Sequence, residues 1–139
     1  MAETFDVLLK VARARRDTAA QVMNAAQQKV VQARGEISRL EAIERGIKPT
    51  DETVFATGTF LCHIGRRKRQ LQDQLPLLER KLDAAKQDLL EAFTECKRLE
   101  VLIERQDRAE AQEETRRETV LVDELAQQQY RLGRMSTRN

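Results

Sequence analysis

The sequence lacks tryptophan, and glycine and proline are scarce, with five and two residues among 139. So few turn-forming residues leave little material for turns, which argues against a fold of many short elements. The composition is 40% hydrophobic, 35% charged and only 4% aromatic. This balance is typical of long-helix and coiled-coil proteins, and one structural unit is expected.

Cysteine and histidine are also scarce, being limited to Cys62, Cys96 and His63. The two cysteines lie 34 residues apart on one predicted helix, so they cannot form a disulfide within it. Cys96 lies in a regular apolar row of that helix and is interpreted as a small hydrophobic residue. We expect no metal site and no cofactor, because these residues do not make a metal-binding group.

Long hydrophobic runs are missing as well. The first apolar cluster, residues 7–9, is too short for a signal peptide or a membrane span, and Arg13, Arg15 and Arg16 prevent it from continuing. The net charge is only +2, from 25 basic and 23 acidic residues. We therefore expect a cytoplasmic protein whose charge does not by itself call for nucleic acid or an anionic membrane.

What the sequence does contain is a regular apolar spacing from Leu61 to Ile103. Positions alternate three and four residues apart, and twelve of these thirteen are apolar. This heptad pattern predicts a helix that packs along its length on another helix. We call this row of positions the second seam, because a similar row lies earlier in the chain. Its members are Leu61, Ile64, Lys68, Leu71, Leu75, Leu78, Leu82, Ala85, Leu89, Ala92, Cys96, Leu99 and Ile103.

The same spacing appears near the start of the chain, so the partner helix lies in the same polypeptide. Eleven of thirteen positions in this first seam are apolar. They are Phe5, Leu9, Ala12, Arg16, Ala19, Met23, Ala26, Val30, Ala33, Ile37, Leu40, Glu44 and Ile47. The connector is short, Gly46 can end the first helix and Pro49 cannot continue it, so the chain returns antiparallel. The predicted fold is all-α, a long antiparallel two-helix coiled coil, or helical hairpin.

Several residues depart from this pattern. Arg16 and Lys68 occupy seam positions and are interpreted as imperfections whose aliphatic stems snorkel to solvent. Pro76 lies inside the second helix, where it removes one backbone hydrogen bond and predicts a kink near Gln72.

The second helix is predicted to be longer than the first. We expect helix one at 4–45, a tip loop at 46–58, helix two at 59–132 and a disordered tail at 133–139, with Thr57 or Thr59 as the N-cap of helix two. Ten of the sixteen residues in 104–119 are charged and no apolar stripe continues there. An overhanging helix of this kind is either solvated or docked on another molecule.

Three stretches carry a resemblance to a known family, and they cover essentially the whole chain. They are "LLKVARARRDTAAQVMNAAQQ" near the N-terminus, "FLCHIGRRKRQLQ" beside the tip and "RRETVLVDELAQ" near the C-terminus. In this order and spacing the chain resembles the flagellar FliJ proteins of the type III export apparatus. The most specific piece is Asp123, Glu124, Leu125 and Ala126, preceded by Arg117-Glu118.

The resemblance implies a coiled coil similar to the gamma stalk of rotary ATP synthases. Its partners would be the hexameric flagellar export ATPase, the cytoplasmic domain of the membrane export gate and substrate chaperones, with a role in chaperone escort. The protein would lie at the flagellar base and reach the inner membrane only through these partners.

Residues carried over by the resemblance fall at both ends of the hairpin. The gate contact at the tip would comprise Leu40, Ile43, Ile47, Phe60 and Ile64. The ATPase contact at the end with the termini would comprise Phe5, Arg13, Asp123, Glu124 and Leu125.

Other functions remain open or are disfavoured. The basic run 66–69 could meet phosphates, but no aromatic residue interleaves it and Lys68 points to the seam, so no nucleic acid is expected. No phosphate loop or nucleophile-base pair is present, so an enzyme is not expected and no catalytic residue is assigned. The alternatives that remain are a generic coiled-coil adaptor dimerising through Val122 and Leu125, and the equivalent stalk of a virulence secretion system.

Overall fold

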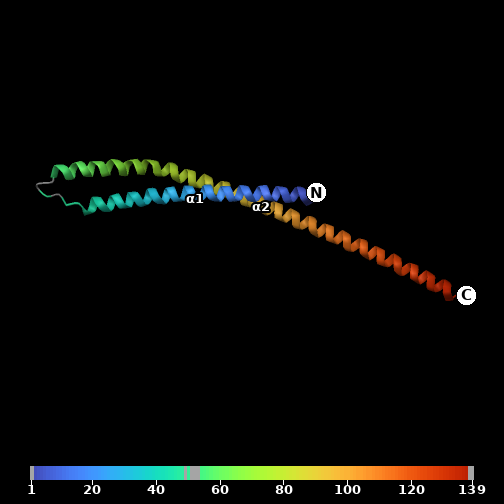
Figure 1. Cartoon of the computed structure of the whole chain (residues 1–139). Coiled ribbons are helices and arrows are strands. Elements are labelled where there is room, and N and C mark those ends of the chain that lie inside the picture. The colour runs from blue at the N-terminus through green and yellow to red at the C-terminus, as the bar shows by residue number, and fades with distance from the viewer. Residues whose placement is uncertain (1, 49, 51–53, 138–139) are drawn as a thin grey trace. The chain divides into compact units, whose positions relative to one another are not determined.

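The computed structural model describes the backbone of residues 2–48, 50 and 54–137, which form two helices (Figure 1). Helix α1 spans Ala2–Gly46 and helix α2 spans Val54–Thr137. Within the described ranges there is no strand. The chain is all-α, as the sequence predicts.

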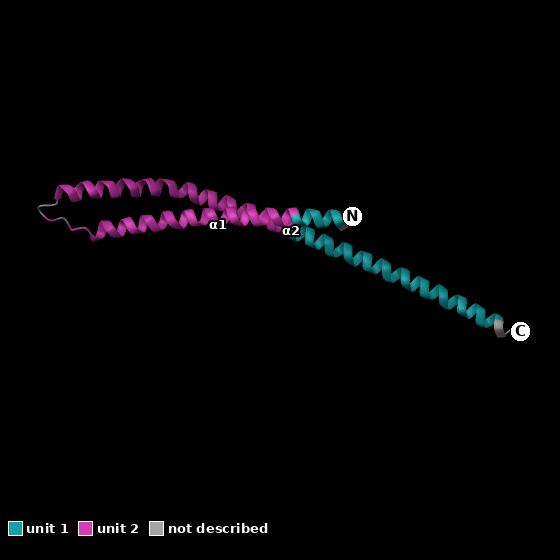
Figure 2. Cartoon of the chain, viewed as in Figure 1, with its two compact units in different colours: residues 1–10, 97–139 teal, residues 11–96 magenta. Residues whose placement is uncertain are grey.

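The two helices are divided between two compact units (Figure 2). Unit 2 comprises residues 11–96, in which α1 and the first half of α2 form an antiparallel hairpin. Unit 1 comprises residues 1–10 and 97–139, and therefore contains the start of α1 and the second half of α2. The expectation of one structural unit for the whole chain stays a prediction.

The core of unit 2 follows the two predicted seams. Every buried side chain in the described part of this unit belongs to a seam, and none is polar. These residues are Ala12, Val30, Ala33, Leu40, Ile64, Leu71, Ala85 and Cys96. The other seam positions of unit 2 are half-buried, and none is exposed. The heptad prediction is therefore confirmed, and Cys96, which is 2% exposed, is packed as a small hydrophobic residue.

The sequence interpretation of Lys68 was wrong. The Lys68 Nζ atom lies 3.1 Å from the Glu44 Oε2 atom, so the polar residue of the second seam pairs with a polar residue of the first. Both side chains are less than one-third exposed, which protects the pair from screening by solvent. Arg16 differs, because its guanidinium lies 3.4 Å from the carboxylate of its neighbour Asp17 on the same helix.

Further ion pairs connect the two helices of unit 2 along the edges of the seams. The guanidinium of Arg34 lies 2.7 Å from a Glu79 carboxylate oxygen. A longer contact of 3.9 Å joins Arg15 and Glu95. These side chains are exposed, so each pair stabilises the hairpin by only about 0–1 kcal/mol. The hairpin is therefore held mainly by burial of the seams.

Helix α2 is longer than the sequence predicts at both ends. It begins at Val54, so Thr57 and Thr59 lie inside the helix and are not its N-cap. The Thr59 hydroxyl donates a 3.1 Å hydrogen bond to the carbonyl oxygen of Phe55, which is a contact within a helix. At the other end the helix continues to Thr137, so residues 133–137 are helical, and residues 138 and 139 lie outside the described range.

Pro76 lies inside α2 without ending it. Its ring is exposed, as expected for a residue outside the seam. The carbonyl group of Gln72 cannot accept the usual helical hydrogen bond, because proline has no N–H group. A kink at this position stays a prediction.

Unit 1 has a short paired region followed by a long region of exposed side chains. The buried or half-buried side chains among its described residues are Phe5, Leu9, Leu99, Glu100, Ile103 and Gln106. Every side chain from residue 107 to residue 135 is exposed. We call residues 107–135 the arm. Contacts within this helix include the 3.7 Å one between Glu113 and Arg117, which lie one turn apart.

Candidate functional site

Two surfaces correspond to the sites expected from the sequence, namely the loop end of the hairpin in unit 2 and the arm in unit 1. We call residues 40–48 and 54–64 the tip. Two of its residues, Leu40 and Ile64, form a buried cluster with Leu71, which lies next to the tip on α2; we call this the tip cluster, and its members are 8%, 5% and 4% exposed. Ile43 and Ile47 pack against this cluster and are half-buried. These contacts hold the ends of the two helices together.

The five expected gate-contact residues therefore differ in their exposure, since some are buried and others are accessible to solvent. Leu40 and Ile64 are core residues, so their side chains are not available to a partner while the hairpin is intact. Ile43 and Ile47 present part of their surface to solvent. Phe60 is 51% exposed and is the most accessible of the five.

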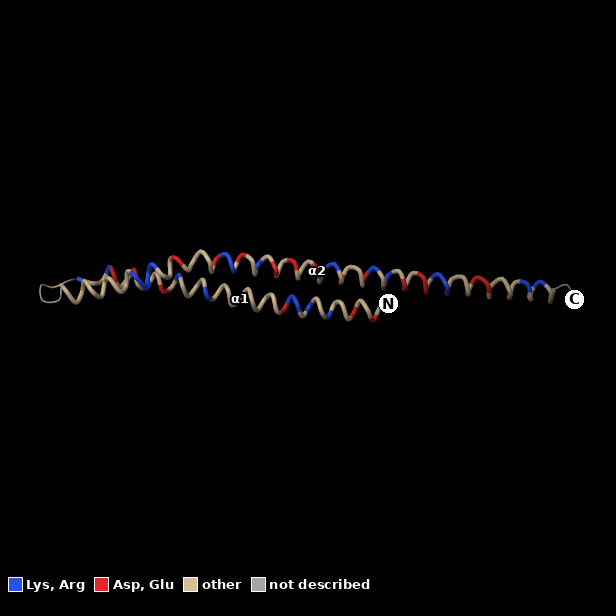
Figure 3. The backbone as a smooth tube through the Cα atoms, turned by 90° about the horizontal axis from the view of Figure 1, so that it is seen from above, with Lys and Arg blue, Asp and Glu red and all other residues tan. Residues whose placement is uncertain are grey.

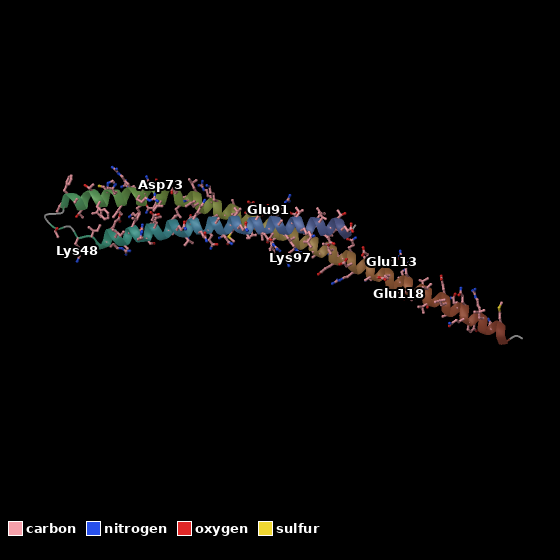
Figure 4. The ribbon with its side chains drawn as sticks, viewed as in Figure 1. Lys48, Asp73, Glu91, Lys97, Glu113 and Glu118 are labelled. Atoms are coloured by element: carbon pink, nitrogen blue, oxygen red, sulfur yellow. The ribbon has the colours of Figure 1, made fainter. Side chains whose placement is uncertain are left out.

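The tip also exposes two apolar residues that the sequence analysis did not assign to it. Phe55 is 90% exposed and Val54 is 56% exposed, both in the first turn of α2. A phenylalanine exposed to this extent is unusual in a folded protein and commonly marks a contact surface. Lys48 lies at the same end of the hairpin (Figure 4). The signal that could have found this surface is the apolar pair at 54–55 directly after the polar run 50–53.

The residues expected at the ATPase-facing end do not form one cluster. Phe5 is half-buried in the paired region of unit 1, whereas Asp123, Glu124 and Leu125 are exposed on the arm. At a rise of about 1.5 Å per residue, Leu125 lies roughly 28 Å along the helix from Gln106, the last half-buried side chain. Arg13 belongs to unit 2 and is exposed.

The arm carries charges of both signs along its length (Figure 3). Glu113 and Glu118 lie on it (Figure 4). Near its C-terminal end it also exposes large apolar residues. Four of them share one stripe at helical spacing, and they are Leu121, Leu125, Leu132 and Met135. No described residue of unit 1 covers this stripe, since each of the four is more than half exposed.

The basic run 66–69 is partly neutralised. Arg67 lies 3.2 Å from a Glu36 carboxylate oxygen, and Lys68 is paired with Glu44. Two of the four cations therefore have carboxylate partners on α1, which weakens the run as a phosphate-binding surface.

Metal sites and membrane spans are not found among the described residues. No group of three or more His, Cys, Asp or Glu side chains there could hold a metal ion. In the same part of the chain, neither helix contains a stretch apolar enough to cross a membrane. Cys62 and Cys96 are both free thiols, the first exposed and the second buried.

A hairpin packed along two heptad seams defines the chain as a coiled-coil protein. A family model described as Flagellar FliJ protein matches residues 1–134. The chain therefore belongs to the FliJ family, and it has a function in flagellar protein export, in interaction with the export machinery. Searches of curated proteins and of solved structures found no match to this chain.

Proposed function

We propose that the chain is a non-catalytic stalk of the flagellar type III export apparatus. In this proposal the arm engages the ring of the export ATPase, and the tip contacts the cytoplasmic domain of the membrane export gate. The stalk promotes export and flagellar assembly and assists the transfer of substrate chaperones. It works in the cytoplasm at the flagellar base, and is peripheral to the inner membrane through its partners.

The observation that carries this proposal is the exposure of every arm side chain from residue 107 to residue 135. An isolated helix gains little stability in water, so contact with a partner would stabilise the arm. Mixed charge and a narrow apolar stripe give shallow contacts, which suit a rod held in the central hole of a ring. A contact that differs between nucleotide states would bias the ring through its differential affinity.

The test is ATP hydrolysis by the cognate export ATPase with and without this chain. We expect the full chain to stimulate hydrolysis, and a chain ending at Gln106 to lose the stimulation, because it lacks the arm. Leu125→Asp should reduce stimulation by about tenfold, because it places a charge in the apolar stripe. Gln127→Asp is the matched control, since it adds the same charge to the arm outside the stripe, and it should retain stimulation.

The proposal for the arm is wrong if the truncated chain stimulates the ATPase as well as the full chain does. A concentration-dependent dimer in sedimentation, lost in Leu125→Asp, together with no effect on the ATPase, would instead support a dimerising adaptor.

The gate contact has a separate test, because it depends on the tip. Phe55→Ala together with Phe60→Ala should weaken binding to the purified cytoplasmic domain of the gate by about tenfold. Both side chains are exposed, so the thermal unfolding midpoint should stay unchanged. Unchanged binding by this double variant would exclude the tip phenylalanines as the contact.

A further inference from the structure

Unit 2 has an apolar groove along one side of the hairpin, which neither the tip nor the arm shares. Two adjoining hollows of about 500 and about 400 Å³ make it up, and Val22, Ala85 and Asp88 line both of them. Because they share these residues, the hollows form one continuous feature. We call it the side groove.

On α1, the side groove follows a second heptad row beside the seam. Its members are spaced four and three residues apart in alternation, and all are exposed: Val11, Arg15, Thr18, Val22, Ala25 and Lys29. A helix with two such rows packs on one partner through the first and has room for another helix along the second. From Val11 to Lys29 the row is about 27 Å long at about 1.5 Å per residue.

The exposed apolar surface in this row is substantial. Val11 is 48% exposed and Val22 is 55% exposed, on a face that the hairpin does not use. Across the groove, α2 contributes Leu78 and Ala84, and no aromatic side chain fills the space. A third helix could therefore approach both α1 and α2 closely.

The charges around the side groove favour a partner with negative charge. Three cations line it, Arg15 and Lys29 from α1 and Lys81 from α2, against one carboxylate, Asp88. Arg15 has a long contact with Glu95, but neither lysine is in an ion pair with any residue of the described ranges. A second copy of the chain would bring the same positive rim, so symmetric pairing through this groove is disfavoured.

We propose that the side groove binds a single amphipathic helix of another polypeptide, which carries carboxylates along the edges of its apolar stripe. The apolar stripe packs on Val11 and Val22, and the carboxylates meet Lys29 and Lys81. This interaction goes beyond the proposed stalk function, because it uses residues of neither the tip nor the arm.

The probe for this proposal is a synthetic, fluorescein-labelled helical peptide of about 18 residues, which matches the length of the groove. It has leucines at three- and four-residue spacing and glutamates on both edges of this stripe. A twin peptide carries lysines in place of the glutamates. Fluorescence anisotropy measures the binding of both peptides to the full chain. We expect saturable binding of the acidic peptide, and binding of the basic twin that is at least about tenfold weaker.

Two matched variants test whether the peptide occupies the side groove. Val22→Glu should weaken binding of the acidic peptide by at least about tenfold, because it places a negative charge in the apolar row. Val31→Glu is the control. Val31 is 61% exposed on the same helix, but it lies in a polar hollow lined by Asn24, Gln27, Gln28 and Gln32. This control should change binding by less than about twofold. Lys29→Glu combined with Lys81→Glu should reverse the preference between the two peptides.

The proposal is overturned if the two peptides bind equally, if Val31→Glu weakens binding as much as Val22→Glu does, or if binding does not saturate. It is also overturned if the chain forms a concentration-dependent dimer that Val22→Glu abolishes, since a second copy would then be the occupant. Val22→Glu should still stimulate the export ATPase. Failure of the groove proposal is thereby distinguishable from failure of the stalk proposal.

Discussion

Leu71 and Leu77 lie on the same helix, but in opposite environments. Leu71 is 4% exposed and belongs to the tip cluster, whereas Leu77 is 57% exposed. We predict that Leu71→Ala lowers the free energy of unfolding by about 2–5 kcal/mol, because it removes buried methyl groups and leaves a cavity. Leu77→Ala should change it by less than about 0.5 kcal/mol. Urea denaturation followed by circular dichroism measures both, and equal effects would contradict the seam assignment.

The contact between Glu44 and Lys68 allows a second prediction at the residue scale. A double-mutant cycle with Glu44→Ala and Lys68→Ala should give a coupling energy of about 0.5–1 kcal/mol, because both side chains are shielded from water. The same cycle on Glu36 and Arg67 should give a smaller value, since Arg67 is 50% exposed. A coupling energy of zero for the first pair would show that the contact between Glu44 and Lys68 does not stabilise the protein.

The sequence could predict which residues are buried, but not this pairing. Burial follows from the three- and four-residue spacing, which each helix shows by itself. The contact between Glu44 and Lys68 depends on the register between the helices, and a shift of one heptad would preserve both seams while separating these two residues. Spacing within each helix does not fix that register.

At the scale of the element, Pro76 makes α2 less stable than its sequence otherwise allows. We predict that Pro76→Ala raises the free energy of unfolding by about 2–3 kcal/mol, because alanine restores the hydrogen bond to the Gln72 carbonyl and relieves the ring's steric conflict. Gln74→Ala, at another exposed position two residues away, is the control and should change stability by only a few tenths of a kcal/mol. Urea denaturation measures both variants, and an unchanged stability in Pro76→Ala would contradict the cost assigned to the proline.

The helix boundaries show a second limit of prediction from sequence. Threonine is a good N-cap, so Thr57 and Thr59 favoured a late start for α2. The helix instead begins at Val54, and this places Phe55 on an exposed helical face. The tip surface was therefore predicted only in part, since local capping preferences do not determine where tertiary packing lets a helix begin.

At the scale of the whole molecule, the arm and the paired regions should be separable in stability. Removing every residue after Gln106 should shift the thermal unfolding midpoint by less than about 2 °C, because each arm side chain from 107 to 135 is already exposed. A chain ending at Arg98 is the control. It also lacks the half-buried Leu99 and Ile103, so its midpoint should fall by several degrees, to be measured by calorimetry. A large loss of stability in the first truncation would show that the arm has a folded partner.

The exposure of the arm has consequences for how the molecule unfolds. The backbone hydrogen bonds of the arm join residues of the same helix. We therefore expect the arm to unwind and rewind within about a microsecond. Gentle warming should melt it from Thr137 inward while the seams stay closed, and a protease should cut its arginines first. Binding of the arm inside a ring would then stabilise its helix. The partner around the arm would therefore determine whether the arm is helical and stiff or unfolded and flexible.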